Sequence, residues 1–207
     1  MTILLSDPRV AAVPVRDTGD QPVLLQAGLS HGDVWVRAGL AVRLAEAATA
    51  LPDGVRLHVV EGWRPAAQQS AIITRYTAEL RRRHPDAGDA ELRVLASRFV
   101  APLEVAPHVA GAAVDLTLVT ADGAPLDLGT EVDATPEQSG GRCYTGSDLV
   151  VGEAREHREL MARALGGAGL VNYPTEWWHW SFGDRYWALV TGAPAALYGP
   201  MVVERAA

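Results

Sequence analysis

The feature of this sequence that most constrains its fold is one aspartate inside an apolar segment. Residues 113–119 read Ala-Val-Asp-Leu-Thr-Leu-Val, a composition typical of a buried β-strand, so Asp115 is expected to face inward. A carboxylate is costly to bury unless it is paired with a cation or bound to a metal ion. The fold must therefore bring a partner to Asp115, or else leave it at a solvent-exposed strand edge.

His108, seven positions before Asp115, is the first candidate partner. Two ligands of one zinc ion each lie ~2 Å from the metal, whereas seven extended residues span ~23 Å. The chain must therefore fold back between them, and the small residues Ala110-Gly111-Ala112 permit this. Taken alone, the pair is weak evidence for a metal site; the alternative is an aspartate at a strand edge and a histidine on the surface.

A second candidate pair is Glu176 and His179, in an aromatic segment, residues 176–180, that predicts a strand. A glutamate that is not itself a ligand can take a proton from a metal-bound water. Positions i and i+3 of an ideal strand point to opposite faces, so both serve one site only if the strand is irregular or ends between them. Pro174 favours a disturbed strand start. The alternative is an aromatic core strand with a buried neutral histidine.

Arg64 is the third candidate. It follows a predicted strand and precedes Pro65, which keeps the backbone extended or in a turn. Such a position suits a side chain that projects into a cleft, where a guanidinium can stabilise the oxyanion formed on a carbonyl under attack. The alternative is a structural ion pair with one of the 25 acidic residues.

The hydrophobic pattern predicts a single domain over residues 1–207, a length that can bury a sizeable core. Residues 1–30 show no pattern and are predicted to be irregular, and Asp89 is predicted to cap a helix. The predicted helices are 34–51, 66–83, 89–99 and 147–165, and the predicted strands are 55–60, 113–119 and 176–180. Because helices and strands are interspersed without regular alternation, the predicted fold class is α+β.

The net charge of −7 excludes a basic nucleic-acid-binding surface, and the run 81–84 is interpreted as a solvated helix face. No segment has the pattern of a signal peptide or the length of a membrane span, so we expect a cytoplasmic protein. The single cysteine, Cys143, excludes an internal disulfide and a cysteine-rich zinc site. A catalytic thiol would need a histidine beside it in the fold.

Together the motifs resemble those of the zinc D-Ala-D-Ala dipeptidases of the VanX type, relatives of the zinc D-Ala-D-Ala carboxypeptidases and the hedgehog signalling domain. That family carries D/E-G-Y/W-R-P, then S-x-H-x-x-G-x-A-x-D-L-T-L, then E-W-W-H-Y/W. The matching segments, in the same order, are Glu61-Gly62-Trp63-Arg64-Pro65, residues 108–118 and residues 176–180. The resemblance spans residues 34–182 and implies a central, mostly antiparallel sheet flanked by helices.

Carried over residue by residue, the resemblance implies that His108, Asp115 and His179 bind one zinc ion. Glu176 matches the general base and Arg64 the arginine that polarises the scissile carbonyl. In the family an aspartate beyond the second motif holds the substrate ammonium, and Asp133 aligns with it best. The family serine two residues before the first histidine is replaced by Ala106, which leaves the substrate preference open without affecting the zinc ligands.

The implied activity is hydrolysis of a small dipeptide, D-Ala-D-Ala or a similar one, by a water that the zinc activates. Neither a nucleic acid nor a membrane is an expected partner, and a homo-oligomer is left open. Two His and one Asp can also hold iron(II), but that triad usually begins His-x-Asp. Other readings are a D,D-carboxypeptidase, a peptidoglycan-stem endopeptidase, or a zinc-stabilised binding module without catalysis.

Overall fold

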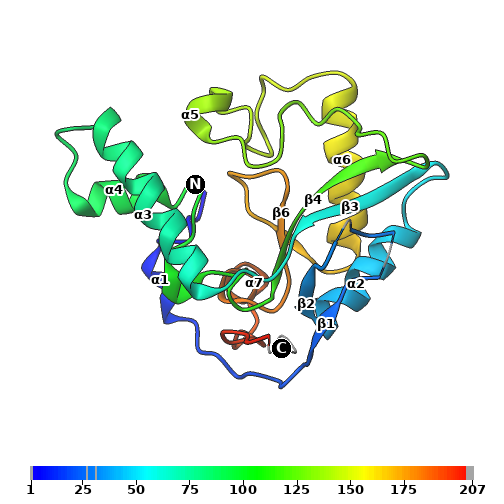
Figure 1. The fold of residues 1–207 in the computed structure, drawn as a ribbon, viewed down its shortest axis with the longest axis horizontal. Helices are drawn as coiled ribbons and strands as arrows, with labels where there is room; N and C mark the ends of the chain where they lie inside the picture. The colour runs from blue at the N-terminus through cyan, green and yellow to red at the C-terminus, as the bar shows by residue number, and fades with distance from the viewer. Residues whose placement is uncertain (1, 27, 31, 204–207) are drawn as a thin grey trace.

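The centre of the molecule is a four-stranded antiparallel sheet in the order β3-β4-β6-β5 (Figure 1). The computed structural model describes residues 2–26, 28–30 and 32–203. The strands are β3 (Val55–Glu61), β4 (Ala113–Thr120), β5 (Val171–Asn172) and β6 (His179–Ser181). A second, two-stranded antiparallel sheet pairs β1 (Pro22–Leu24) with β2 (Trp35–Arg37). The predicted α+β class and the antiparallel central sheet are confirmed.

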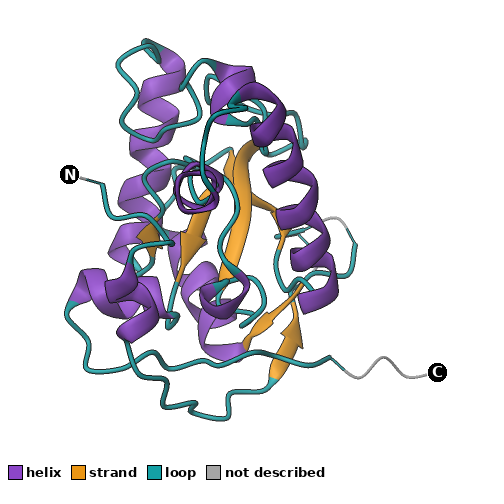
Figure 2. Ribbon diagram, turned by 90° about the vertical axis from the view of Figure 1, so that its left-hand side faces the viewer, coloured by secondary structure: helices purple, strands orange, loops and turns teal. Residues whose placement is uncertain are grey.

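Helices lie on both sides of this sheet (Figure 2). The longest are α2 (Ala38–Thr49), α3 (Ala66–Arg83) and α6 (Glu153–Gly167). The shorter ones are α1 (Pro8–Ala12), α4 (Asp89–Ala96), the 3-10 turn η1 (Leu103–Val105), α5 (Pro136–Ser139) and α7 (Arg185–Thr191). No helix in the described ranges is long and apolar enough to cross a membrane.

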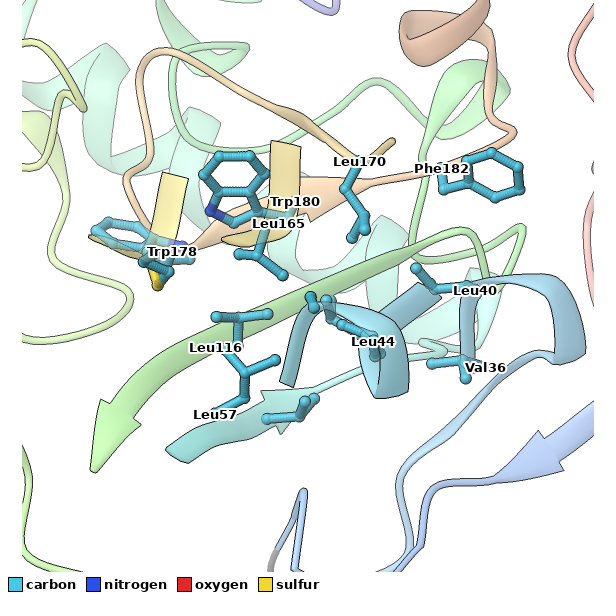
Figure 3. Close-up of a cluster of buried hydrophobic side chains, with 14 of the residues drawn as sticks. Val36, Leu40, Leu44, Leu57, Leu116, Leu165, Leu170, Trp178, Trp180 and Phe182 are labelled. Atoms are coloured by element: carbon cyan, nitrogen blue, oxygen red, sulfur yellow. The ribbon is translucent and has the colours of Figure 1, made fainter. Parts of the chain in front are cut away.

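Apolar packing places α2 and α6 in one cluster and α3 and α4 in another. Leu44 of α2 and Leu165 of α6 join Leu57 and Leu116 of the sheet in the main core (Figure 3). On the other side of the molecule, α3 and α4 pack on each other through a separate cluster that includes Leu80 and Leu92 (Figure 1). The α3–α4 pair therefore forms a lobe beside the sheet, joined to it through β3 and the segment that leads to β4.

Three predicted elements have the expected positions: residues 55–60 form β3, residues 66–83 form α3 and residues 113–119 form β4. The prediction of an irregular N-terminal segment is wrong, since α1 and β1 lie within it. Asp7 caps α1 by accepting a hydrogen bond from the Arg9 amide, 2.9 Å away. Pro8 occupies the first helical position, where a missing N–H costs nothing.

The predicted helix starts and ends are less accurate. The helix predicted over 34–51 begins only at Ala38, because residues 35–37 pair with β1. The helix predicted from 147 begins at Glu153, since Gly152 adopts a positive φ of 62° directly before it. The 89–99 helix ends at Ala96, and its N-cap is Gly88 rather than Asp89, which lies in the first turn. Helix α5 had no counterpart among the predictions.

Candidate metal centre

Three buried side chains meet at one end of the central sheet: His108, Asp115 and His179. Asp115 on β4 and His179 on β6 lie opposite each other in the strand register. One ligand atom from each of the three residues lies within 4.8 Å of the others. The His108 Nε2–Asp115 Oδ2 distance is 3.3 Å, and the His179 Nδ1–Asp115 Oδ1 distance is 3.1 Å. Ligands of one tetrahedral zinc ion lie about 3.3 Å apart, so the spacing fits a metal site.

The chain folds back between His108 and Asp115, as their spacing predicts. The amides of Gly111 and Ala112 donate to the carbonyls of His108 and Pro107, each at 3.0 Å. Gly111 adopts a φ of 63°, and a Cβ there would lie 2.5 Å from the sulfur of Met201. Glycine is therefore needed at this turn for both backbone conformation and space.

The backbone around Arg64 and the His108 loop are tied together reciprocally. His108 Nδ1 lies 2.7 Å from the carbonyl of Gly62, and the amide of Arg64 donates to the carbonyl of His108 at 3.2 Å. Since a carbonyl only accepts, Nδ1 carries the proton, which leaves Nε2 free to bind a metal. These two bonds fix the orientation of the imidazole and join the first motif to the second.

Glu176 lies beside the cluster without belonging to it. It occupies the turn before β6, which begins only at His179, so the predicted strand over 176–180 is too long at its start. Its Oε2 atom lies 3.8 Å from His179 Nδ1. Burial, together with the nearby Asp115 carboxylate, raises the pKa of Glu176 well above its usual value. The strand thus begins only after Glu176, and Glu176 and His179 can both line one cavity although they are three residues apart.

The three side chains of the cluster affect one another's pKa values. Burial acts to raise the pKa of Asp115, but the two histidines outweigh it and lower the pKa well below the usual range. Burial lowers the pKa of His179, whereas at His108 the Asp115 carboxylate outweighs burial and raises the pKa. An anionic carboxylate between two imidazoles is an arrangement suited to a divalent cation.

Arg64 makes the structural ion pair and also faces the cluster. Its Nε donates to Glu61 Oε1 at 2.8 Å, and Nη2 donates to the second oxygen of the same carboxylate. Nη2 also lies 4.0 Å from Asp115 Oδ2. Burial acts to lower the pKa of Arg64, but Glu61 outweighs it and raises the pKa. The structural ion pair is therefore present, and it holds the guanidinium beside the cluster; the action of Arg64 on a substrate carbonyl stays a prediction.

Asp133 comes from the loop between β4 and α6 and lines the same cavity. Among the described non-glycine residues, Asp133 alone has a positive φ, 64°. Asp tolerates this conformation, which recurs at functional positions. Burial and the nearby Asp115 and Glu61 carboxylates raise the pKa of Asp133 to about 6. Asp133 as a whole remains exposed to solvent, so its carboxylate lies where the cavity opens and a cation can reach it.

All six predicted site residues line one cavity of about 430 Å³ between α3 and the sheet. The wall on the α3 side is formed in part by Gln69, Ile72, Arg75 and Tyr76. Cys143 lies outside this lining; it is buried, with its backbone amide bonded to Ser139, and burial raises the pKa of its thiol. A raised pKa does not fit a nucleophilic thiol.

Two functional neighbours were missing from the sequence-based set: Glu61 and Gln69, the side chains that hold Arg64. Glu61 stands inside the first motif, three residues before Arg64, so its position gave a usable signal. Gln69 lies one helical turn into α3 and gives no such signal, because its contact with Arg64 depends on where the helix begins.

The sequence profile of the family described as D-ala-D-ala dipeptidase matches residues 34–191. The chain belongs to this D-Ala-D-Ala dipeptidase family. A D-alanyl-D-alanine dipeptidase from Synechocystis sp. is 30% identical over 175 residues, an alignment that covers 74% of this chain and 71% of the relative. The resemblance stated from the three motifs is confirmed, and with it the assignment as a peptidase.

A solved structure shares the fold of this dipeptidase-family chain. VanYB in complex with D-Alanine-D-Alanine superposes with a TM-score of 0.50 at 18% identity, covering 86% of this chain and 88% of that one. A mutant of the vancomycin resistance D,D-pentapeptidase VanY in complex with Zn(II) gives a TM-score of 0.49 at 16% identity, covering 89% and 90%. At this level of identity the likeness concerns the fold.

Proposed function

We propose that this protein is a zinc-dependent dipeptidase that hydrolyses D-Ala-D-Ala or a similar short D-amino-acid dipeptide. The observation that carries the proposal is the meeting of His108, Asp115 and His179 with a separate carboxylate, Glu176, in one cavity. The family membership and the name of the Synechocystis relative support the dipeptidase assignment.

The donor set fits a catalytic zinc ion. Two imidazole nitrogens and one carboxylate oxygen are three protein ligands, and catalytic zinc sites keep the fourth position open for water or substrate. A structural site would be closed by a fourth protein ligand. When bound, zinc lowers the pKa of its water to ~7 and polarises the substrate carbonyl.

Glu176 is the proton carrier in this proposal. Its carboxylate accepts a proton from the attacking water and returns it to the amine that leaves when the peptide bond breaks. Burial and the neighbouring carboxylates raise the pKa of Glu176, which is the direction that favours uptake of a proton by its carboxylate. Such a group typically contributes ~10²–10⁴-fold to the rate.

Arg64 orients the carbonyl and stabilises the oxyanion that develops on it. Its guanidinium side chain is only 11% exposed, so water competes weakly for its N–H groups. Asp133 holds the free ammonium of the substrate. This last contact is what would separate a dipeptidase from a carboxypeptidase, because an acylated substrate has no ammonium to bind.

The main alternative is a D,D-carboxypeptidase or another amide hydrolase acting on a longer peptide. VanYB, described as a complex with D-Alanine-D-Alanine, shares the fold, and Ala106 replaces the serine expected from the family pattern. Cytoplasmic location stays a prediction that cell fractionation would check, and the oligomeric state, left open by the sequence, can be determined by solution mass measurements.

The test compares hydrolysis of D-Ala-D-Ala, L-Ala-L-Ala and an acylated D-Ala-D-Ala by the zinc-loaded protein and by the protein treated with a chelator. We expect chelator-sensitive release of D-Ala from the free D,D-dipeptide alone. Preferred cleavage of the acylated peptide would assign the protein to the carboxypeptidases and remove the role of Asp133. Full activity without metal would contradict the zinc assignment itself.

A further inference from the structure

The guanidinium of Arg64 is held from two directions. Glu61 accepts from Nε and Nη2, and Gln69 Oε1 accepts from Nη1 at 2.8 Å. A guanidinium carries five N–H groups, so these three bonds leave one N–H on each terminal nitrogen without a partner among the described residues. These two groups are the donors that Arg64 can offer to a carbonyl oxygen in the cavity.

Gln69 is itself fixed at both ends of its amide. Its side chain is buried, with 1% of the residue exposed, and Nε2 donates to the carbonyl of Ala101 at 2.8 Å. Arginine can only donate and a backbone carbonyl can only accept, so the two partners together determine which end of the amide is oxygen. Gln69 thus links Arg64 to the segment that leads from Ala101 to His108.

The electrostatics of the cavity explain why an amide suits this position. Five carboxylates already line the cavity: Glu61, Glu79, Asp115, Asp133 and Glu176. A sixth at position 69 would bury more negative charge, whereas an amide oxygen accepts from Arg64 without adding charge. An apolar side chain would leave both Arg64 Nη1 and the Ala101 carbonyl without their present partners.

We propose that Gln69 is a positioning residue that acts on the reaction through Arg64; this inference rests on the role proposed for Arg64 above. A competing acceptor, Asp115 Oδ2, lies 4.0 Å from Arg64 Nη2. Rotation toward Asp115 would both withdraw the free N–H groups from the substrate and compete for a metal ligand. Gln69 opposes this rotation by holding Nη1, the terminal nitrogen that does not bond to Glu61.

The test is a double-mutant cycle on the zinc-loaded protein, with kcat and KM measured for D-Ala-D-Ala in wild type, Gln69→Met, Arg64→Ala and the double variant. Gln69→Met keeps the length of the side chain and removes both hydrogen bonds. We expect it to lower kcat about ten- to a hundredfold with little change in KM, as for the loss of a hydrogen bond to a charged group. In the Arg64→Ala background the same substitution should have no further effect on kcat.

Zinc stoichiometry and melting temperature are measured for every variant, and Gln21→Met is the matched control, since Gln21 is exposed and outside the cavity lining. An equal fold-loss from Gln69→Met with and without Arg64 would show a merely structural role and overturn the proposal. If Gln69→Met does not fold, Gln69→Asn, too short to reach both partners, takes its place under the same criterion. Unchanged kcat in Arg64→Ala alone would instead refute the role of Arg64 in the proposed function.

Discussion

The residues that meet in the cavity are held by two different kinds of structure. Asp115 and His179 lie on paired strands backed by the main core, so their positions follow from strand register and apolar packing. Asp133 lies on the connection between β4 and α6, residues 121–152, whose only helix is the short α5 in the described structure (Figure 1). A substitution that weakens the connection should therefore leave the paired strands in place, and a substitution in the strands should leave the connection in place.

Polar contacts from Arg158 hold this connection. Its side chain is buried, and its guanidinium donates to the carbonyls of Leu128, Arg142 and Tyr144 at 2.7–2.8 Å. Burial lowers the pKa of Arg158 to about 10. It also lies over the ring of Trp177, 5.5 Å from its centroid. A cation paired with carbonyl dipoles therefore holds the loop, in addition to the apolar contacts that Leu128 and Cys143 make with the main core.

The largest expected effect comes from substitution of Glu176, which lies directly before β6 of the central sheet. Glu176→Gln should lower kcat by about 10²–10⁴-fold, since it removes the proton carrier. Zinc content and melting temperature should stay close to those of wild type, because Glu176 is not a ligand and glutamine has nearly the same shape. Rate measurements combined with metal analysis check this, and near-normal turnover would refute the assigned mechanism.

A change at Arg158 tests whether the loop is supported separately. Arg158→Met leaves three buried carbonyls without their donor, at a cost of about 1–3 kcal/mol each if no water replaces it. We expect lower thermal stability and a higher KM for the free dipeptide, with zinc affinity retained. Arg158→Lys, which keeps the charge, should lose less. A loss of zinc as large as the change in KM would show that loop and sheet are not independent.

Asp133→Asn probes the loop residue itself. It removes the charge that would bind the substrate ammonium, so KM for D-Ala-D-Ala should rise about 10- to 100-fold, the size expected for a charge-assisted hydrogen bond. Any residual cleavage of an acylated dipeptide should not change. Steady-state kinetics on both substrates provide the check, and equal effects on the two would refute ammonium recognition by Asp133.

The smallest expected effect concerns the contact between the loop and the α3–α4 lobe. Glu137 of α5 accepts from the Tyr76 hydroxyl at 2.7 Å and from Arg98 Nη2 at 2.6 Å. Burial acts to raise its pKa, but the two donors outweigh burial and lower the pKa below 4.5. A lowered folded-state pKa gives stability that is present above the unfolded pKa and is lost as pH falls through the folded one.

Glu137→Gln should therefore lower the melting temperature slightly near pH 7, and the difference from wild type should shrink on acidification below about pH 4. Thermal melts of both proteins across this range measure it. A difference that does not depend on pH would mean that the charge of Glu137 contributes nothing.

The difference between the central sheet and the connection over residues 121–152 explains which parts of the fold the sequence could predict. The strand that carries Asp115 and the helix over residues 66–83 were predicted because their apolar patterns are local. The path of residues 121–152 was not, since Arg158 fixes it through contacts 14–30 residues away along the chain. Asp133 was selected by alignment with the family, and no local pattern indicates its positive φ.

The reciprocal bonds between residues 62–64 and His108 also have a consequence for how such proteins diversify. These bonds join the chain just before the α3–α4 lobe to the chain just after it. The lobe therefore begins and ends at two fixed points. For Arg64, the first turn of α3, which contains Gln69, and the Ala101 carbonyl that Gln69 contacts must keep their places. Beyond it, evolution or protein engineering can lengthen or exchange the lobe, and so reshape one wall of the cavity, while the arginine and the first imidazole stay in register.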